Sequence, residues 1–118
     1  MSDRRWPRWV YDTGEEPDYR FSFANERTFL AWVRTALALV AAGVAVGAVN
    51  LNMAPWLQHA VAVALALLGG LAAVAAWWRW AQSERAMRQD APLPGPGVTV
   101  LIAGGTLVVG LVVIVATL

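Results

Sequence analysis

The sequence contains no cysteine and no lysine, and it has few charged residues of either sign. Without cysteine the chain has neither a disulfide framework nor a thiolate metal site. All nine basic residues are arginines, and charged residues make up 14% of the chain, against about 25% in an average soluble domain. The net charge of +1 provides no overall basic field, so we expect no nucleic-acid partner.

Groups that usually carry enzyme chemistry are also scarce. The only histidine, His59, has no carboxylate or serine in an evident arrangement with it. The sequence has no phosphate-binding loop motif, no spacing typical of metal ligands and no nucleophile close to a base. We therefore expect a protein that is not an enzyme and that uses neither a cofactor nor a metal.

Long apolar stretches are what the sequence has in abundance, and 58% of its residues are apolar. Three stretches, 29–49, 56–78 and 98–118, are 21 to 23 residues long, and Arg34 is their only formally charged residue. A membrane-spanning helix needs about 20 such residues, and a helix pairs its own backbone groups where water is absent. The sequence therefore predicts an all-α membrane protein with three transmembrane helices, at about 25–50, 55–89 and 98–118.

The distribution of arginine predicts how these helices are oriented. Five arginines precede the first apolar stretch, and the second connection holds Arg85 and Arg88, with Arg79 at its border. The first connection and the C-terminus hold none. Because cytoplasmic loops are enriched in basic residues, we expect a cytoplasmic N-terminus and a C-terminus outside. The chain then divides into a cytoplasmic or interfacial tail, 1–22, and a three-helix transmembrane domain, 23–118.

The N-terminal tail alternates arginine with the aromatic residues Trp6, Trp9, Tyr11 and Tyr19. Such a segment can lie on an anionic membrane surface. Alternatively, its aromatic side chains pack on the helix bundle. The tail lacks the apolar run of a cleaved signal peptide, so we expect the first membrane helix to be retained.

The first apolar stretch has two different faces. At 100° per residue Arg34 lies about 20° from Arg27, and several alanines share this stripe. Gly43 and Gly47 lie on the opposite side. Small residues let helices approach closely in lipid, although an alanine-rich composition alone produces some of them. The residues predicted to pack helices together are Ala31, Ala38, Gly43, Ala45, Gly47, Gly69, Gly70, Gly104 and Gly105.

Arg34 lies inside an apolar stretch, where a charge at the bilayer centre costs about 2.5–3.5 kcal/mol and less near the edge. One interpretation is that its long side chain bends back to the lipid headgroups. The other is that Arg34 and Arg27 face a wet, protein-lined vestibule, since charged residues within a membrane commonly mark functional sites. Glu26 lies about 100° round the helix, and we expect it to pair with an arginine of a neighbouring helix or subunit, such as Arg79 or Arg85.

The stretch FANERTFLAWVRTALAL, residues 23–39, resembles the signature of the YidH-like family of small three-helix bacterial membrane proteins of unknown function. The pattern R-T-x-L-A-W-x-R-T runs from Arg27 to Thr35. The resemblance extends over nearly the whole chain in topology. It implies a multi-pass protein of the bacterial inner (plasma) membrane.

Phe23 to Leu30 are also similar to a motif in the membrane subunits of the vacuolar transporter chaperone (VTC) complex. The helices of that complex form a channel for polyphosphate that basic side chains line. This resemblance implies that Glu26 and Arg27 lie at the cytoplasmic mouth of such a channel, with Arg79 or Arg85 as a second basic position. The separate catalytic domain of that complex has no counterpart in the sequence, so polyphosphate synthesis is not implied.

Two functional hypotheses follow from these patterns. In the first, the chain forms a homo-oligomer in the lipid bilayer, and Arg27, Arg34, Arg79 and Arg85 line a cytoplasmic vestibule that binds or conducts phosphate or polyphosphate. Arginine suits phosphate because its planar guanidinium donates paired hydrogen bonds. In the second, the chain is a structural or regulatory membrane subunit that scaffolds a larger protein and transports nothing.

Overall fold

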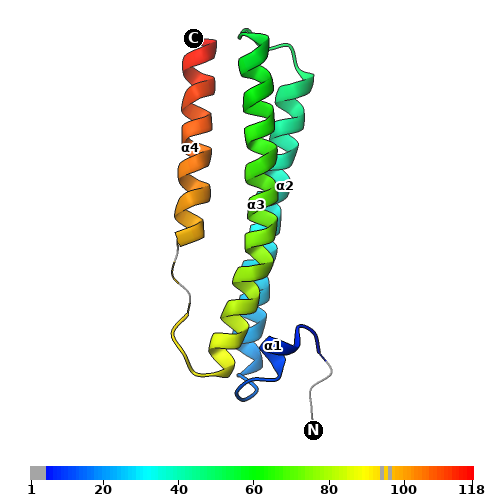
Figure 1. The fold of residues 1–118 in the computed structure, drawn as a ribbon, viewed down its shortest axis with the longest axis vertical. Helices are drawn as coiled ribbons and strands as arrows, with labels where there is room; N and C mark the ends of the chain where they lie inside the picture. Colours follow the sequence, from blue (N-terminus) through cyan, green and yellow to red (C-terminus); the bar gives the residue numbers. More distant parts are fainter. Residues whose placement is uncertain (1–4, 94, 96) are drawn as a thin grey trace.

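The structure of the chain is a computed structural model that describes residues 5–93, 95 and 97–118. The first four residues of the predicted tail lie outside the described residues. The described helices are α1 (Arg8–Tyr11), α2 (Tyr19–Ala48), α3 (Pro55–Arg88) and α4 (Gly97–Thr117). The three long helices run side by side in an elongated molecule (Figure 1). Each is long and apolar enough to cross a membrane, and this confirms the predicted all-α fold with three transmembrane helices.

Helix α2 begins earlier than the sequence analysis predicted. Asp18 caps it, because its side chain accepts a hydrogen bond of 2.9 Å from the backbone nitrogen of Arg20. The helix is then continuous from Tyr19, about three turns before the apolar stretch starts. Position 22, where the sequence analysis ends the tail, therefore lies inside this helix, and the division into a tail and a membrane domain stays a prediction.

The connection between α2 and α3 is short, and one side chain, that of Gln58, links its two ends by hydrogen bonds. Pro55 occupies the first turn of α3, where the missing N–H of proline costs nothing. The amide nitrogen of Gln58 donates to the carbonyls of Val46 and Val49, at 2.7 and 2.6 Å. These are carbonyls that the end of α2 would otherwise leave unpaired.

Two glycines allow α2 and α3 to approach closely along the membrane half of the molecule. A Cβ atom on Gly43 would lie 2.8 Å from the carbonyl oxygen of Ala62. A Cβ atom on Gly69 would lie 2.8 Å from the carbonyl oxygen of Ala36. Both distances are too short for real atoms, so only glycine permits this spacing of the backbones.

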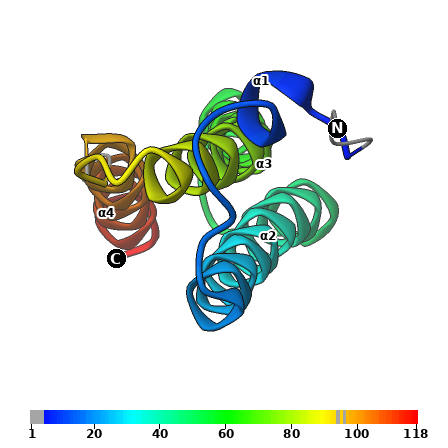
Figure 2. The same ribbon diagram turned by 90° about the horizontal axis from the view of Figure 1, so that it is seen from below.

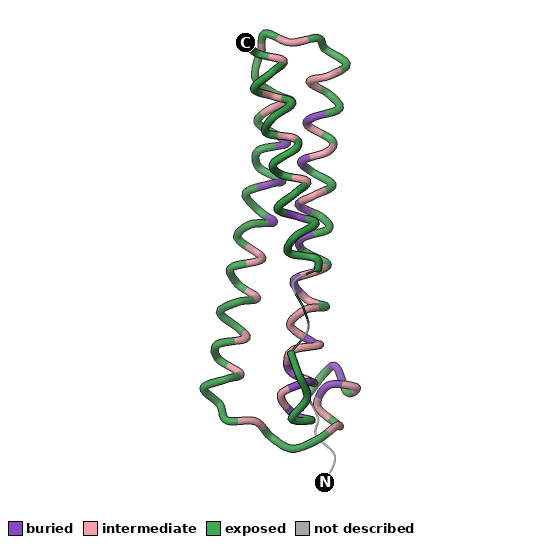
Figure 3. Tube along the Cα trace, turned by 90° about the vertical axis from the view of Figure 1, so that its left-hand side faces the viewer, coloured by how far each residue is buried: buried purple, intermediate pink, exposed green. Residues whose placement is uncertain are grey.

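Helix α4 packs on α3 alone among the described elements. Figure 2 shows α3 in the middle, with α2 and α4 on its two sides. Ile102 is the one residue of α4 that is buried, and a Cβ atom on Gly105 would lie 2.9 Å from Leu68. Figure 3 shows that exposed residues dominate the long helices. Large exposed apolar surfaces of this kind belong against lipid or another protein.

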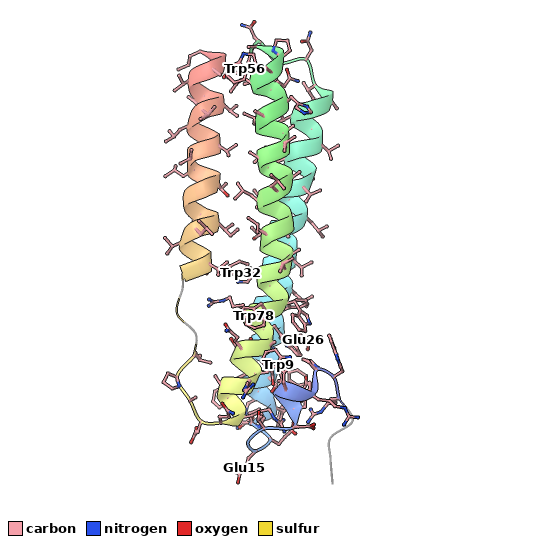
Figure 4. All side chains as sticks on the ribbon, in the orientation of Figure 1. Trp9, Glu15, Glu26, Trp32, Trp56 and Trp78 are labelled. Atoms are coloured by element: carbon pink, nitrogen blue, oxygen red, sulfur yellow. The ribbon has the colours of Figure 1, made fainter. Side chains whose placement is uncertain are left out.

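The length of α4 indicates where the membrane lies. Its 21 residues span about 31 Å, which matches a hydrocarbon core of about 30 Å. Figure 4 shows Trp32 at the level where α4 begins and Trp56 near the opposite end, and tryptophan is typical of both membrane interfaces. Beyond Trp32, residues 19–31 of α2 and 79–88 of α3 continue past the membrane level. We refer to these two segments as the stalk.

Candidate functional site

The N-terminal segment, residues 5–18, packs against the stalk. Its aromatic side chains meet those of α3 in three pairs, whose ring centroids lie 5.5 to 6.3 Å apart. The pairs are Trp6 with Trp77, Trp9 with Trp78 and Tyr11 with Trp80. Of the two arrangements expected for this segment, the structure shows the one in which the aromatics pack on the bundle.

Arg88 at the end of α3 fastens this segment. Its side chain is 6% exposed. Nε donates to the carbonyl of Thr13 at 2.9 Å, and one Nη donates to the carbonyl of Tyr11 at 2.8 Å. The other Nη donates to the carboxylate of Glu16 at 3.2 Å. The sequence analysis used Arg88 only as a charge that sets orientation, because nothing in its spacing indicates a buried position.

Gly14 lets the N-terminal segment reach the end of α3. Its φ of +60° is in the left-handed region that favours glycine, and a Cβ atom there would lie 1.8 Å from the carbonyl oxygen of Arg88. The backbone nitrogen of Glu15 donates to that same oxygen at 2.8 Å. The segment therefore supplies a partner for a carbonyl at the end of α3.

Glu16 lies between two arginines at the edge of this contact. Nη1 and Nη2 of Arg5 donate to the two carboxylate oxygens of Glu16, at 3.1 and 2.6 Å. The hydrogen bond from Arg5 is the main reason that the pKa of Glu16 lies below its usual value, and Arg88 adds to this lowering. Desolvation of the carboxylate acts in the opposite direction.

Glu84 connects the two helices of the stalk. It is a buried residue with 4% exposure. It accepts hydrogen bonds from the Ser22 hydroxyl at 3.3 Å and the Asn25 amide at 3.4 Å. The Asn25 amide also donates to the carbonyl of Trp80 at 3.0 Å. Asn25 is the third residue of the FANERT stretch, so this part of the motif holds α2 and α3 together in the stalk.

Two of the four arginines that were predicted to line a site share one exposed face of α2. Arg27 and Arg34 are both exposed. They point away from the buried face of α2, which holds Ala36, Leu39 and Gly43 and meets α3. Glu26 is exposed next to them along the chain. Ala31, Ala38 and Ala45 are exposed on the same side as the arginines. We call the surface formed by Arg27, Arg34 and these three alanines the arginine face.

The other two arginines lie in different surroundings. The guanidinium of Arg79 lies 5.7 Å from the ring centre of Trp32, and its Nη1 donates to the carbonyl of Gly95 at 3.1 Å. The guanidinium of Arg85 lies 5.6 Å from the ring centre of Trp9. A single copy of the chain therefore does not bring the four predicted arginines together.

The predicted packing glycines also divide into groups. Gly43, Gly69 and Gly105 lie at helix contacts, and a Cβ on Gly47 would be in ordinary contact with Ala62, at 3.7 Å. Among the described residues no atom lies within 4 Å of a Cβ built on Gly70 or Gly104. Within the part of one copy that the structure describes, these last two glycines therefore lie at no close helix contact.

Comparison with known proteins identifies the family. Residues 20–86 match the family described as "Domain of unknown function (DUF202)". The "Uncharacterized protein Rv2272" of Mycobacterium tuberculosis is 48% identical over 101 residues, which cover 85% of this chain and 83% of that protein. The "Inner membrane protein YidH" of Escherichia coli K12 is 44% identical over 101 residues, which cover 85% and 88%. No solved structure gives a significant match. The chain therefore belongs to the YidH-like family, carries the DUF202 domain and is a multi-pass protein of the bacterial inner membrane.

Proposed function

We propose that the chain is a non-enzymatic subunit of a homo-oligomer, whose copies meet through the arginine face and enclose an anion-binding vestibule open to the cytoplasm. One observation carries this proposal. Arg34 is exposed, points away from α3 and lies two residues further into the membrane than Trp32. A lone copy would turn this charge toward lipid, whereas a second copy on the same face would turn it toward protein and water.

The spacing of the two arginines suits such a vestibule. Along the axis of α2, Arg27 lies about 7.5 Å outside the level of Trp32, and Arg34 lies about 3 Å inside it. Copies arranged around an axis would present two rings of guanidinium groups, one at the mouth and one just inside. Rings of arginine are a known way to select anions and phosphate, and the alanines of the arginine face allow helices to approach closely.

The positive charges of arginines in a ring repel one another and destabilise the assembled state. An anion bound between the guanidinium groups would offset the repulsion, so phosphate or polyphosphate should stabilise the assembled state. Arg79 and Arg85 lie outside the arginine face and are not needed for these rings.

Two features support the orientation in this proposal. The N-terminal segment and the arginines of the stalk lie at one end of the molecule, and the α2–α3 connection and the C-terminus lie at the other (Figure 1). Basic residues favour the cytoplasmic side, so the stalk would be cytoplasmic and the C-terminus outside. The resemblance of Phe23 to Leu30 to the membrane subunits of the vacuolar transporter chaperone complex supports the same placement of the mouth.

Native mass spectrometry in detergent, combined with binding of radiolabelled phosphate and polyphosphate, tests the proposal. We expect a closed ring of three or more copies, and we expect Arg34→Ala to weaken anion binding at least tenfold. Arg20→Ala is the matched control, because it removes an exposed arginine from the same helix, one that is not among the residues of the arginine face and pairs with Asp18. A monomeric mass, or equal binding by the Arg34→Ala and Arg20→Ala variants, would overturn it.

A second candidate function is a structural subunit that scaffolds a larger membrane protein. The observation that favours it is the shallow position of Arg34, about 3 Å inside the level of Trp32, from which a long side chain can reach the headgroups. This alternative predicts a monomer in detergent and a single larger protein that copurifies under gentle conditions. A ring of identical copies with no such partner would exclude it.

A further inference from the structure

A cavity of about 290 Å³ lies between α2 and α3, on the side of α2 away from the arginine face. It is at the boundary of the stalk and the membrane half, because Trp32 and Arg79 line it. Leu93, from the connection to α4, also lines it. The cavity thus lies at the level where a bilayer changes from hydrocarbon to headgroups.

The lining of this cavity is amphiphilic. Apolar and aromatic side chains dominate it, with Phe29 and Trp32 from α2 among them. Thr28 and Ser83 contribute hydroxyl groups. Arg79 is the only charged side chain among the described residues that line it. A ligand that fits these walls has a single negative charge, a few polar groups and an apolar part.

Arg79 is held in place and retains capacity to bind. Its guanidinium lies near the ring of Trp32 and uses one nitrogen to bind the carbonyl of Gly95. A guanidinium has five N–H donors in a fixed plane, and the structure describes one hydrogen bond from them, to the carbonyl of Gly95. The geometry matches a phosphodiester, which accepts two parallel hydrogen bonds from one arginine.

We propose that this cavity binds the head group of an anionic phospholipid, with its phosphate on Arg79. Small-molecule sites start at about 300 Å³, so the cavity holds a glycerol phosphate but not the acyl chains. The acyl chains would lie outside the cavity, where the long helices expose apolar side chains. The proposal is independent of the vestibule, which would lie on the opposite side of α2.

The apolar walls favour a lipid over free phosphate. Inorganic phosphate and polyphosphate would lose hydration against Phe29 and Trp32 without gaining a polar partner there. A lipid places apolar groups against those walls and needs only one cation for its phosphate.

The test is a lipid-binding experiment on the delipidated protein. Phosphatidylglycerol or phosphatidylcholine is added back, and native mass spectrometry measures how much of each lipid binds. We expect phosphatidylglycerol to bind at least tenfold more tightly than phosphatidylcholine. Arg79→Gln should remove most of this preference. Arg85→Gln is the matched control, since Arg85 also lies beside a tryptophan, Trp9 of the N-terminal segment, but does not line the cavity. The affinity of this variant for phosphatidylglycerol should stay within twofold of the parent.

A second variant distinguishes loss of lipid binding in the cavity from loss of binding caused by misfolding of the stalk. Ser83→Leu fills the cavity and leaves the arginine in place, so it should also lose phosphatidylglycerol binding, whereas Arg79→Lys should keep most of it. Equal losses in the Arg79→Gln and Arg85→Gln variants, or unchanged binding by Ser83→Leu, would overturn the proposal. So would inorganic phosphate that binds in the millimolar range with the same dependence on Arg79, because the ligand would then be a soluble phosphate.

Discussion

Between Trp32 and Ala48, α2 meets α3 through alanine, leucine and glycine, whereas in the stalk the same helix meets α3 through Ser22 and Asn25 hydrogen-bonded to Glu84. In lipid the surroundings are as apolar as the contact, so close packing of small residues has to hold the helices. In the stalk, water competes for each helix, and buried polar groups must be paired with one another. One continuous pair of helices is thus joined by two different kinds of interaction.

The largest expected effect comes from a substitution in the membrane half at Gly69, where the backbones of α2 and α3 approach closely. In Gly69→Val the new Cβ would lie 2.8 Å from the carbonyl oxygen of Ala36, a backbone atom that cannot turn away. Overpacking of a tight contact costs about 1–3 kcal/mol or more, so we expect a clear loss of thermal stability in detergent. Gly70→Val is the control next to it, because a Cβ there meets no described atom. Similar melting temperatures for the two variants would contradict close packing at Gly69.

The next largest effect comes from a substitution that removes the contact between the N-terminal segment and α3 and should leave the membrane half intact. Arg88→Met removes the donors to the carbonyls of Tyr11 and Thr13. Hydrogen bonds from a charged group contribute about 1.5–3 kcal/mol, so the N-terminal segment should detach from α3. Hydrogen exchange of residues 5–18 and their cleavage by protease should rise strongly, with little change in the exchange of the membrane half.

Arg20→Met is the control for that experiment, because Arg20 is exposed and, among the described residues, its ion pair is with Asp18. It should leave the exchange of residues 5–18 as it is. If Arg88→Met instead lowers protection throughout α2 and α3, the stalk and the membrane half fold as one unit, and the contrast between them is structural only.

A smaller effect sharpens the comparison within the membrane half. Gly105→Leu places side-chain atoms against Leu68, whose contacting atoms are the ends of a flexible side chain rather than backbone. Leu68 can therefore move aside, and we expect a loss of stability of about 1 kcal/mol, at the lower end of overpacking costs. Gly104→Leu should be neutral. A loss as large as that of Gly69→Val would show that α4 is as tightly held as α2.

The sequence predicts the membrane half much better than the stalk. Apolar length requires three helices, and the wheel of α2 separates Gly43 from the arginine face, as the structure shows. These features are local, because each depends on one helix and its period. The contacts of Arg88 and Glu84 join residues 59 to 77 positions apart. No local sequence pattern predicts these contacts. In the sequence, a buried arginine near the end of a helix cannot be told from an ordinary surface arginine.

The cavity beside Arg79 was missed for the same reason. Its lining combines α2, α3 and the connection to α4, and the sequence analysis assigned Arg79 to the same vestibule as Arg27. Helical periodicity relates residues within one helix only. It does not say which face of α3 meets α2, and that choice decides whether two arginines share a site.

The smallest expected effect is a dependence of the stalk contact on pH through Glu16. Its pKa in the folded protein is lowered, first by the hydrogen bond from Arg5. A carboxylate with a lowered pKa contributes stability that is fully present above its unfolded value, about 4.3, and that is lost as the pH falls through the folded value. The N-terminal segment should therefore keep its protection from pH 8 down to about 5 and lose part of it in more acidic solution. The difference in tryptophan fluorescence between the parent chain and Trp6→Phe isolates the contact of Trp6 with Trp77 and measures this. Glu16→Gln should remove the acid-dependent step because a neutral amide has no proton to gain. A step of the same size in Glu16→Gln would contradict the assignment to Glu16, because the acid sensitivity would then come from a group other than this carboxylate.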